Sequence, residues 1–129
     1  MTASSSRSTP PADGRAVAGR AAEDLAARFL DGQGLHVVAR NFRTKRGEID
    51  LVARDGATLV FVEVRFRRSE SHGGAAESIT AAKQARMVAA AQVYLLRQRG
   101  DPPCRFDAIL LDALDPARID WRRDVIASG

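Results

Sequence analysis

The chain has 129 residues, enough for one domain with a single modest hydrophobic core. Lys and Arg number 20 against 16 Asp and Glu, and the resulting net charge of +4 favours an anionic partner. The single Cys excludes an internal disulfide and a Cys-rich zinc site. No apolar run reaches the roughly 18 residues of a membrane span, and none resembles a secretory signal. We therefore expect a cytoplasmic protein with no membrane partner.

The first half of the chain predicts one helix and three strands. Residues 1–13 are rich in Ser, Thr and Pro, which predicts a disordered tail and leaves 14–129 as the single domain. Apolar residues at helical spacing predict a helix over about 14–31, ended by Gly32 and Gly34. Strands are expected over 35–40, 48–54 and 58–67, with a hairpin turn near Asp55-Gly56.

The second half predicts a long helix between strands. Residues 69–78 read as a loop, and Thr80 is the expected N-cap of a helix that runs to about Arg99. A fourth strand is expected over 105–112, and a short edge strand over 119–122. The order α-β-β-β-α-β predicts a layered α/β domain with a central mixed β-sheet flanked by helices. Consecutive strands are expected to be antiparallel, and the strand after the long helix is expected to be parallel to a neighbour.

Alternation along the strands predicts where the acidic residues point. In the strand over 48–54, an apolar face of Ile49, Leu51 and Ala53 is expected, with Glu48 and Asp50 on the other face. In the strand over 58–67, the even-numbered residues from Val60 to Phe66 form a core face, and the odd-numbered ones, including Glu63, Arg65 and Arg67, share the opposite face.

The turn between these two strands decides how close Asp50 and Glu63 come. A turn at Gly56-Ala57 places them directly opposite, about 5 Å apart at Cβ, and a turn at Asp55-Gly56 places them diagonally, about 7 Å apart. Like charges so placed repel, and a divalent cation such as Mg²⁺, which prefers carboxylate, water and phosphate oxygens, would remove that cost. The alternative is a solvated strand face with cross-strand ion pairs.

These residues also carry a family resemblance. Segments 19–23, 41–43, 47–51, 61–65, 80–86 and 105–107 closely resemble, in the right order, the YraN-like family of small bacterial proteins. That family looks like a branch of the restriction-endonuclease-like PD-(D/E)XK superfamily, close to archaeal Holliday-junction resolvases. The resemblance implies a restriction-endonuclease-like three-layer fold and Mg²⁺- or Mn²⁺-dependent cleavage of nucleic acid.

Site roles follow from the resemblance residue by residue. Asp50 matches the superfamily's metal-binding Asp, Glu63 matches the acid of its E-x-K element, and Glu23 matches a first-helix Glu that often completes such sites. Arg65 stands where the superfamily usually has Lys; Arg can hold phosphate or orient water but cannot give up a proton. The implied partner is branched or flapped DNA, and a homodimer would suit a two-fold junction.

Other charged residues are candidates for supporting roles. Arg43, Lys45 and Arg46 precede the Asp50 strand and Arg67 follows Glu63, which predicts a phosphate-binding rim or, alternatively, a solvated basic surface. Lys83, near a helix start, is either a phosphate contact or a solvated side chain. Glu48 is a candidate accessory ligand or a residue that only sets the strand entry, and an internal ion pair is expected between Arg105 and Asp107.

The sequence therefore supports two alternative functions. The first is a Mg²⁺-dependent, structure-specific DNA endonuclease in repair or recombination, with Asp50, Glu63 and Arg65 as its catalytic residues. The second is a nucleic-acid-binding or protein-interaction module that keeps the fold with weak or no catalysis, since Arg65 replaces the usual Lys.

Overall fold

Our computed structural model describes residues 14–66 and 79–126. The predicted tail at 1–13, the predicted loop at 69–78 and the candidate residue Arg67 lie outside these ranges. No helix in the described ranges is long and apolar enough to cross a membrane.

The elements follow the predicted order. They are α1 (Gly14–Gly32), β1 (His36–Arg43), β2 (Glu48–Asp55), β3 (Thr58–Phe66), α2 (Ala81–Leu96), β4 (Cys104–Leu111), the 3-10 turn η1 (Pro116–Arg118) and β5 (Ile119–Arg122). The Thr80 hydroxyl accepts a hydrogen bond from the Lys83 amide, which confirms the predicted N-cap of α2. Helix α2 ends earlier than expected because the amide of Arg97 closes the last turn onto the carbonyls of Tyr94 and Leu95.

The strands form one mixed sheet with the order β1-β2-β3-β4-β5. Neighbours are antiparallel except β3 and β4, which are parallel, as predicted for the strand after the long helix. Helix α2 is therefore the crossover that parallel pairing requires. Pairing of Asp55 with Thr58 leaves a two-residue turn at Gly56 and Ala57, the first of the two predicted alternatives.

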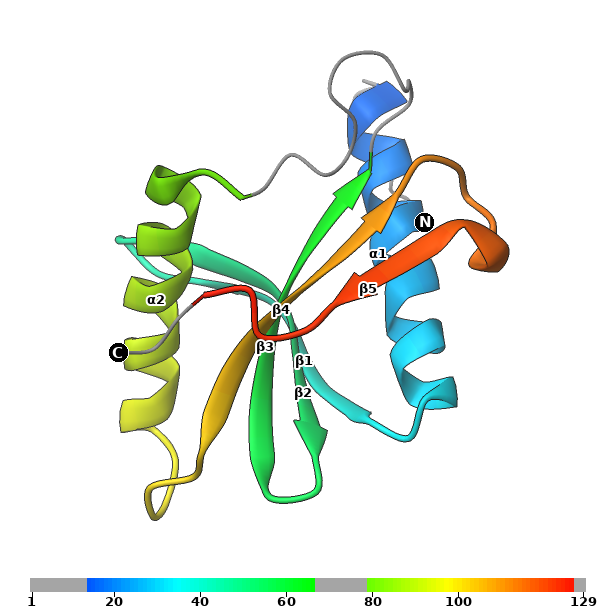
Figure 1. The fold of residues 1–129 in the computed structure, drawn as a ribbon. Helices are drawn as coiled ribbons and strands as arrows, with labels where there is room; N and C mark the ends of the chain where they lie inside the picture. Colours follow the sequence, from blue (N-terminus) through cyan, green and yellow to red (C-terminus); the bar gives the residue numbers. More distant parts are fainter. Residues whose placement is uncertain (1–13, 67–78, 127–129) are drawn as a thin grey trace, which may run out of the picture.

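Each helix covers one face of the sheet (Figure 1). Ala22, Ala26 and Leu30 of α1 pack with residues such as Leu51 and Val62 in the larger core cluster. Ala90 and Ala91 of α2 pack on the opposite face, where Val52, Leu59 and Phe61 are buried. The predicted core face of β3 is confirmed, because Val60 and Val62 are buried against α1, with Val64 and Phe66 beside them.

The predicted apolar face of β2 is wrong at one residue. Ile49 was expected beside Leu51, but it is buried in the cluster under α2, whereas Leu51 is buried under α1. On β1, Phe42 pairs with Ile49 and also packs toward α2, while Arg40 pairs with Leu51. Asn41 between them has a positive φ of 51°, which departs from extended geometry and reverses the side on which the following residues project.

The β1–β2 connection is a tight turn held against α2. The Thr44 side chain accepts hydrogen bonds from the amides of Arg46 and Gly47, and the Thr44 amide donates to the Gly47 carbonyl at 2.8 Å. A Cβ added at Gly47 would overlap the carbonyl oxygen of Arg86 and lie 2.6 Å from its carbonyl carbon. Glycine is needed here so that the turn can approach the α2 backbone.

A buried carboxylate fixes the C-terminal segment. Asp107 on β4 is fully buried and accepts hydrogen bonds from Arg105 Nε (3.0 Å), Trp121 Nε1 (3.0 Å) and the amide of Asp124 (2.9 Å). The expected internal ion pair is confirmed, and Arg105 also reaches Asp55 in the β2–β3 hairpin. These bonds satisfy a charge that would otherwise be costly to bury.

Candidate functional site

Asp50 lies where β2 and β3 separate. The paired residues end at Leu51 and Val62, and the same register continued by one step places Asp50 opposite Glu63. The next step would pair Val64 with Ile49, yet the Val64 amide donates to Asp50 Oδ2 at 2.8 Å. The carboxylate therefore takes the place of a strand carbonyl, which holds it between the two strands rather than on an open face.

The surroundings of Asp50 disfavour its negative charge. Burial and the nearby Glu63 carboxylate raise its pKa from the ordinary 3.8 to about 7, with smaller contributions from the charges of Glu23 and Glu48. The hydrogen bond from Val64 acts in the opposite direction. A carboxylate that is desolvated among other carboxylates is the kind of group that a bound cation would stabilise.

Glu63 is nearly buried and is paired with a lysine from another element. Its side chain is only 8% exposed, and Lys83 Nζ, on the first turn of α2, lies 2.9 Å from its Oε2. Lys83 was predicted as a phosphate contact or a solvated side chain, and half of its surface does remain exposed. Arg65 makes no hydrogen bond or ion pair with Asp50 or Glu63 among the described residues, and its Nη1 is buried without a partner there.

A small open cavity lies beside the Glu63–Lys83 pair. It has a volume of about 40 Å³ and is lined by Glu48, Glu63, Lys83, Arg86 and Met87. This volume has room for a few water molecules. Carboxylates and cations meet in it, so water or a phosphate oxygen placed there would find both hydrogen-bond donors and acceptors.

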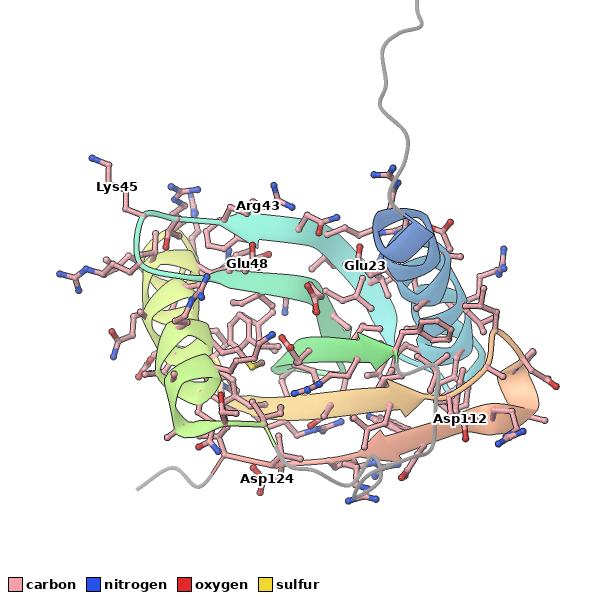
Figure 2. The ribbon with its side chains drawn as sticks, turned by 90° about the horizontal axis from the view of Figure 1, so that it is seen from above. Glu23, Arg43, Lys45, Glu48, Asp112 and Asp124 are labelled. Carbon is pink, nitrogen blue, oxygen red and sulfur yellow. The ribbon has the colours of Figure 1, made fainter. Side chains whose placement is uncertain are left out.

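The two remaining carboxylates are held at the edges of the site. Glu23 Oε1 accepts a hydrogen bond from Asn41 Nδ2 at 3.3 Å, and Glu48 lies 3.4 Å from Arg43 Nε. Figure 2 shows Glu23 on α1 and Glu48 on the strand that leads to Asp50. In the described ranges, no three His, Cys, Asp or Glu side chains converge in a way that could hold a metal ion.

The predicted basic residues are only partly gathered at the site. Arg43, Lys45 and Arg46 are exposed around the β1–β2 turn, and Lys45 projects away from the protein (Figure 2). The close approach of Gly47 to Arg86 brings this turn to the side of α2 that carries Lys83. The β1–β2 turn that carries these cations thus lies near the cavity, which Glu48 and Arg86 line.

Asn41 is the site residue that sequence reasoning missed. Its amide contacts Glu23, and its positive backbone φ lies in β1 next to the point where the residues of β2 change face at Asp50. The available sequence signal was the residue type, since Asn tolerates a left-handed conformation better than most residues. An Asn within a strand pattern is not enough to predict that conformation.

Comparisons with known proteins found relatives over most of the chain. Residues 22–111 match the uncharacterised protein family UPF0102. The chain is similar to UPF0102 proteins of Herminiimonas arsenicoxydans (49% identity over 118 residues, covering 92% of this chain and 93% of the relative) and Ralstonia nicotianae (55% over 120 residues, covering 89% and 90%). A UPF0102 protein of Ralstonia pickettii is 57% identical over 114 residues, covering 84% and 89%.

Proposed function

The chain belongs to the uncharacterised protein family UPF0102, and we propose that it is a metal-dependent, structure-specific DNA endonuclease on a PD-(D/E)XK fold. The observation that supports this most directly is the environment of Asp50. Its carboxylate is held between β2 and β3 by the Val64 amide, opposite the nearly buried Glu63, with its pKa raised to about 7. A carboxylate with a perturbed pKa next to a second acid is typical of catalytic and metal-binding sites.

The two carboxylates fit a hard divalent cation. Mg²⁺ and Mn²⁺ take oxygen ligands, and Mg²⁺ usually binds one or two carboxylates and completes its shell with water and substrate phosphate. Asp50 and Glu63 would hold the ion, and a cation at this position would offset the repulsion that raises the Asp50 pKa. When bound, the ion would polarise the phosphate and activate water for attack on the phosphodiester bond.

Lys83 and Arg65 divide the cationic role in this proposal. The Lys83 ammonium touches Glu63 and also faces the cavity, so it can donate to Glu63 and to a phosphate oxygen at once. Arg65 makes no hydrogen bond or ion pair with Asp50 or Glu63 among the described residues, and we assign it to the phosphate backbone of the substrate. A cation from α2 is thus paired with the acid that matches the E-x-K element, while Arg65 occupies the position of its lysine.

The surrounding basic residues would hold the nucleic-acid backbone. Arg86 lies at the cavity with Glu63, and the exposed Arg43, Lys45 and Arg46 around the β1–β2 turn would extend this basic surface. Phosphate contacts of this kind position a duplex without reading its sequence. The preference for branched or flapped DNA comes from the resemblance to Holliday-junction resolvases, which also suggests a homodimer on a two-fold junction.

A cleavage assay on structured DNA tests the proposal. The purified full chain is incubated with a four-way junction, a flap, a duplex and a single strand, each with Mg²⁺, Mn²⁺ or a chelator. We expect metal-dependent cleavage that is lost in Asp50→Asn and Glu63→Gln. Asp24→Asn is the matched control, because Asp24 is an exposed carboxylate of α1 paired with Arg40. Absence of cleavage on every substrate with both metals would reject the enzyme.

One observation favours a second candidate, a nucleic-acid-binding module without efficient cleavage. Glu63 already has Lys83 as its ionic partner, and Arg65 stands in the usual lysine position. Such a module would bind DNA with a steep salt dependence and with equal affinity in wild type and Asp50→Asn. Metal-dependent cleavage abolished by Asp50→Asn would exclude it.

A further inference from the structure

Two consecutive carboxylates of α1 have different partners on β1. Asp24 Oδ1 lies 2.7 Å from the guanidinium of Arg40, an ion pair that balances its charge. Glu23 Oε1 is bonded at 3.3 Å to Asn41 Nδ2, an uncharged donor. The negative charge of Glu23 therefore stays uncompensated by this contact.

Asn41 has a backbone conformation that few residues accept. Its φ of 51° lies in the left-handed region, where Asn is tolerated more readily than other residues with a side chain. In the register of β1 with β2, Asn41 lies opposite Asp50, since Arg40 pairs with Leu51 and Phe42 with Ile49. The same residue thus adjoins Asp50 through the strand pairing and Glu23 through its side chain.

We propose that Asn41 is a positioning residue of the metal site, which holds the Glu23 carboxylate toward Asp50 as an outer acceptor for water bound to the cation. This inference depends on the proposed function. The register of β1 with β2 sets Asn41 beside Asp50, and its hydrogen bond to Glu23 ties the α1 carboxylate to that position. Partners of this outer kind orient a metal site and contribute measurably to its affinity.

The test uses Mn²⁺ binding to the full chain, measured by titration calorimetry without DNA. Asn41→Gly keeps the left-handed backbone at little cost but removes the amide. We expect the Mn²⁺ dissociation constant to rise roughly tenfold, as for the loss of an outer partner of a metal site. Asp24→Asn, which removes the neighbouring contact between β1 and α1, should change it less than about twofold.

A double-mutant cycle separates the side-chain role from a backbone role. In a Glu23→Gln background the Asn41→Gly substitution should no longer weaken Mn²⁺ binding, because the carboxylate that Asn41 holds is gone. An unchanged dissociation constant in Asn41→Gly alone, or an equal loss in both backgrounds, overturns the positioning role while leaving the Asp50–Glu63 site intact. Absence of saturable Mn²⁺ binding by the wild-type chain overturns both this role and the metal site.

Discussion

Replacing Asp50 with Asn should change how the stability of the protein depends on pH. Asp50 has an ordinary pKa of 3.8 in the unfolded chain and a pKa of about 7 in the folded protein, raised first by burial and then by Glu63. Between these two values the folded protein keeps the Asp50 proton while the unfolded chain has released it. Raising the pH therefore favours unfolding across this window and has no further effect through Asp50 above about pH 7.

The size of the effect follows from the shift. A rise of about three units, at about 1.4 kcal/mol per unit, corresponds to an upper limit of about 4 kcal/mol at pH 8. Asparagine has nearly the same shape and its carbonyl can still accept from the Val64 amide, but it carries no charge. The free energy of unfolding of Asp50→Asn should therefore exceed that of wild type increasingly as the pH rises from about 4 to 7.

Urea unfolding followed by circular dichroism, in chelator-containing buffers from about pH 4.5 to pH 8.5, measures this difference. The matched control is Asp24→Asn, whose side chain is 56% exposed in wild type and whose curve should run parallel to wild type. A difference between Asp50→Asn and wild type that stays constant over the whole range would refute the assignment of a buried, repelled carboxylate to Asp50.

Three further predictions concern other parts of the structure. Gly47→Ala should lose about 2 kcal/mol of stability because its Cβ would overlap the α2 backbone. Gly19→Ala is the control: its Cβ meets nothing within 4 Å, so it should gain up to about 1 kcal/mol, and equal effects of the two substitutions in urea unfolding would contradict the close approach of Gly47 to α2. Asp107→Asn should lose about 3 kcal/mol in the same assay, because the largely buried guanidinium of Arg105 loses one of its two ionic partners and keeps only Asp55; a loss below about 1 kcal/mol would show that the network contributes little. Replacing both Lys45 and Arg46 by Ala should leave stability unchanged but lower the steepness of the plot of log affinity against log salt concentration by about two, measured by fluorescence anisotropy with duplex DNA. An unchanged slope would show that the β1–β2 turn does not contact DNA.

Local patterns were sufficient to predict most of the fold. Alternating residues defined the core face of β3, and Thr80 marked the start of α2, because both features depend on neighbours in sequence. The β2–β3 turn was left open between two positions from sequence alone. The observed turn has Gly56 first, with a φ of 64°, which is the requirement of a tight hairpin turn of the II′ kind.

The arrangement of the candidate site depended on contacts that the sequence could not provide. Alternation assumes extended backbone at every residue, and it failed where Asn41 is left-handed in β1 and where the paired Phe42 and Ile49 both lie in the core under α2. The contact of Lys83 with Glu63 joins residues 20 positions apart and exists only because α2 packs back over the sheet as a crossover. Tertiary packing, rather than local preference, therefore selected which cation lies beside Glu63.

The two strands that end the sheet bear on how copies of this protein could meet. Strand β5 has only four residues, with Asp120 and Arg122 exposed, and β1 has an irregular register between Val37 and Ala39 followed by the left-handed Asn41. Short, charged or irregular edges resist continuous strand pairing with another chain, which protects the sheet from aggregation. We therefore expect any two-fold partner to associate through helix and side-chain surfaces and not by extending the β-sheet.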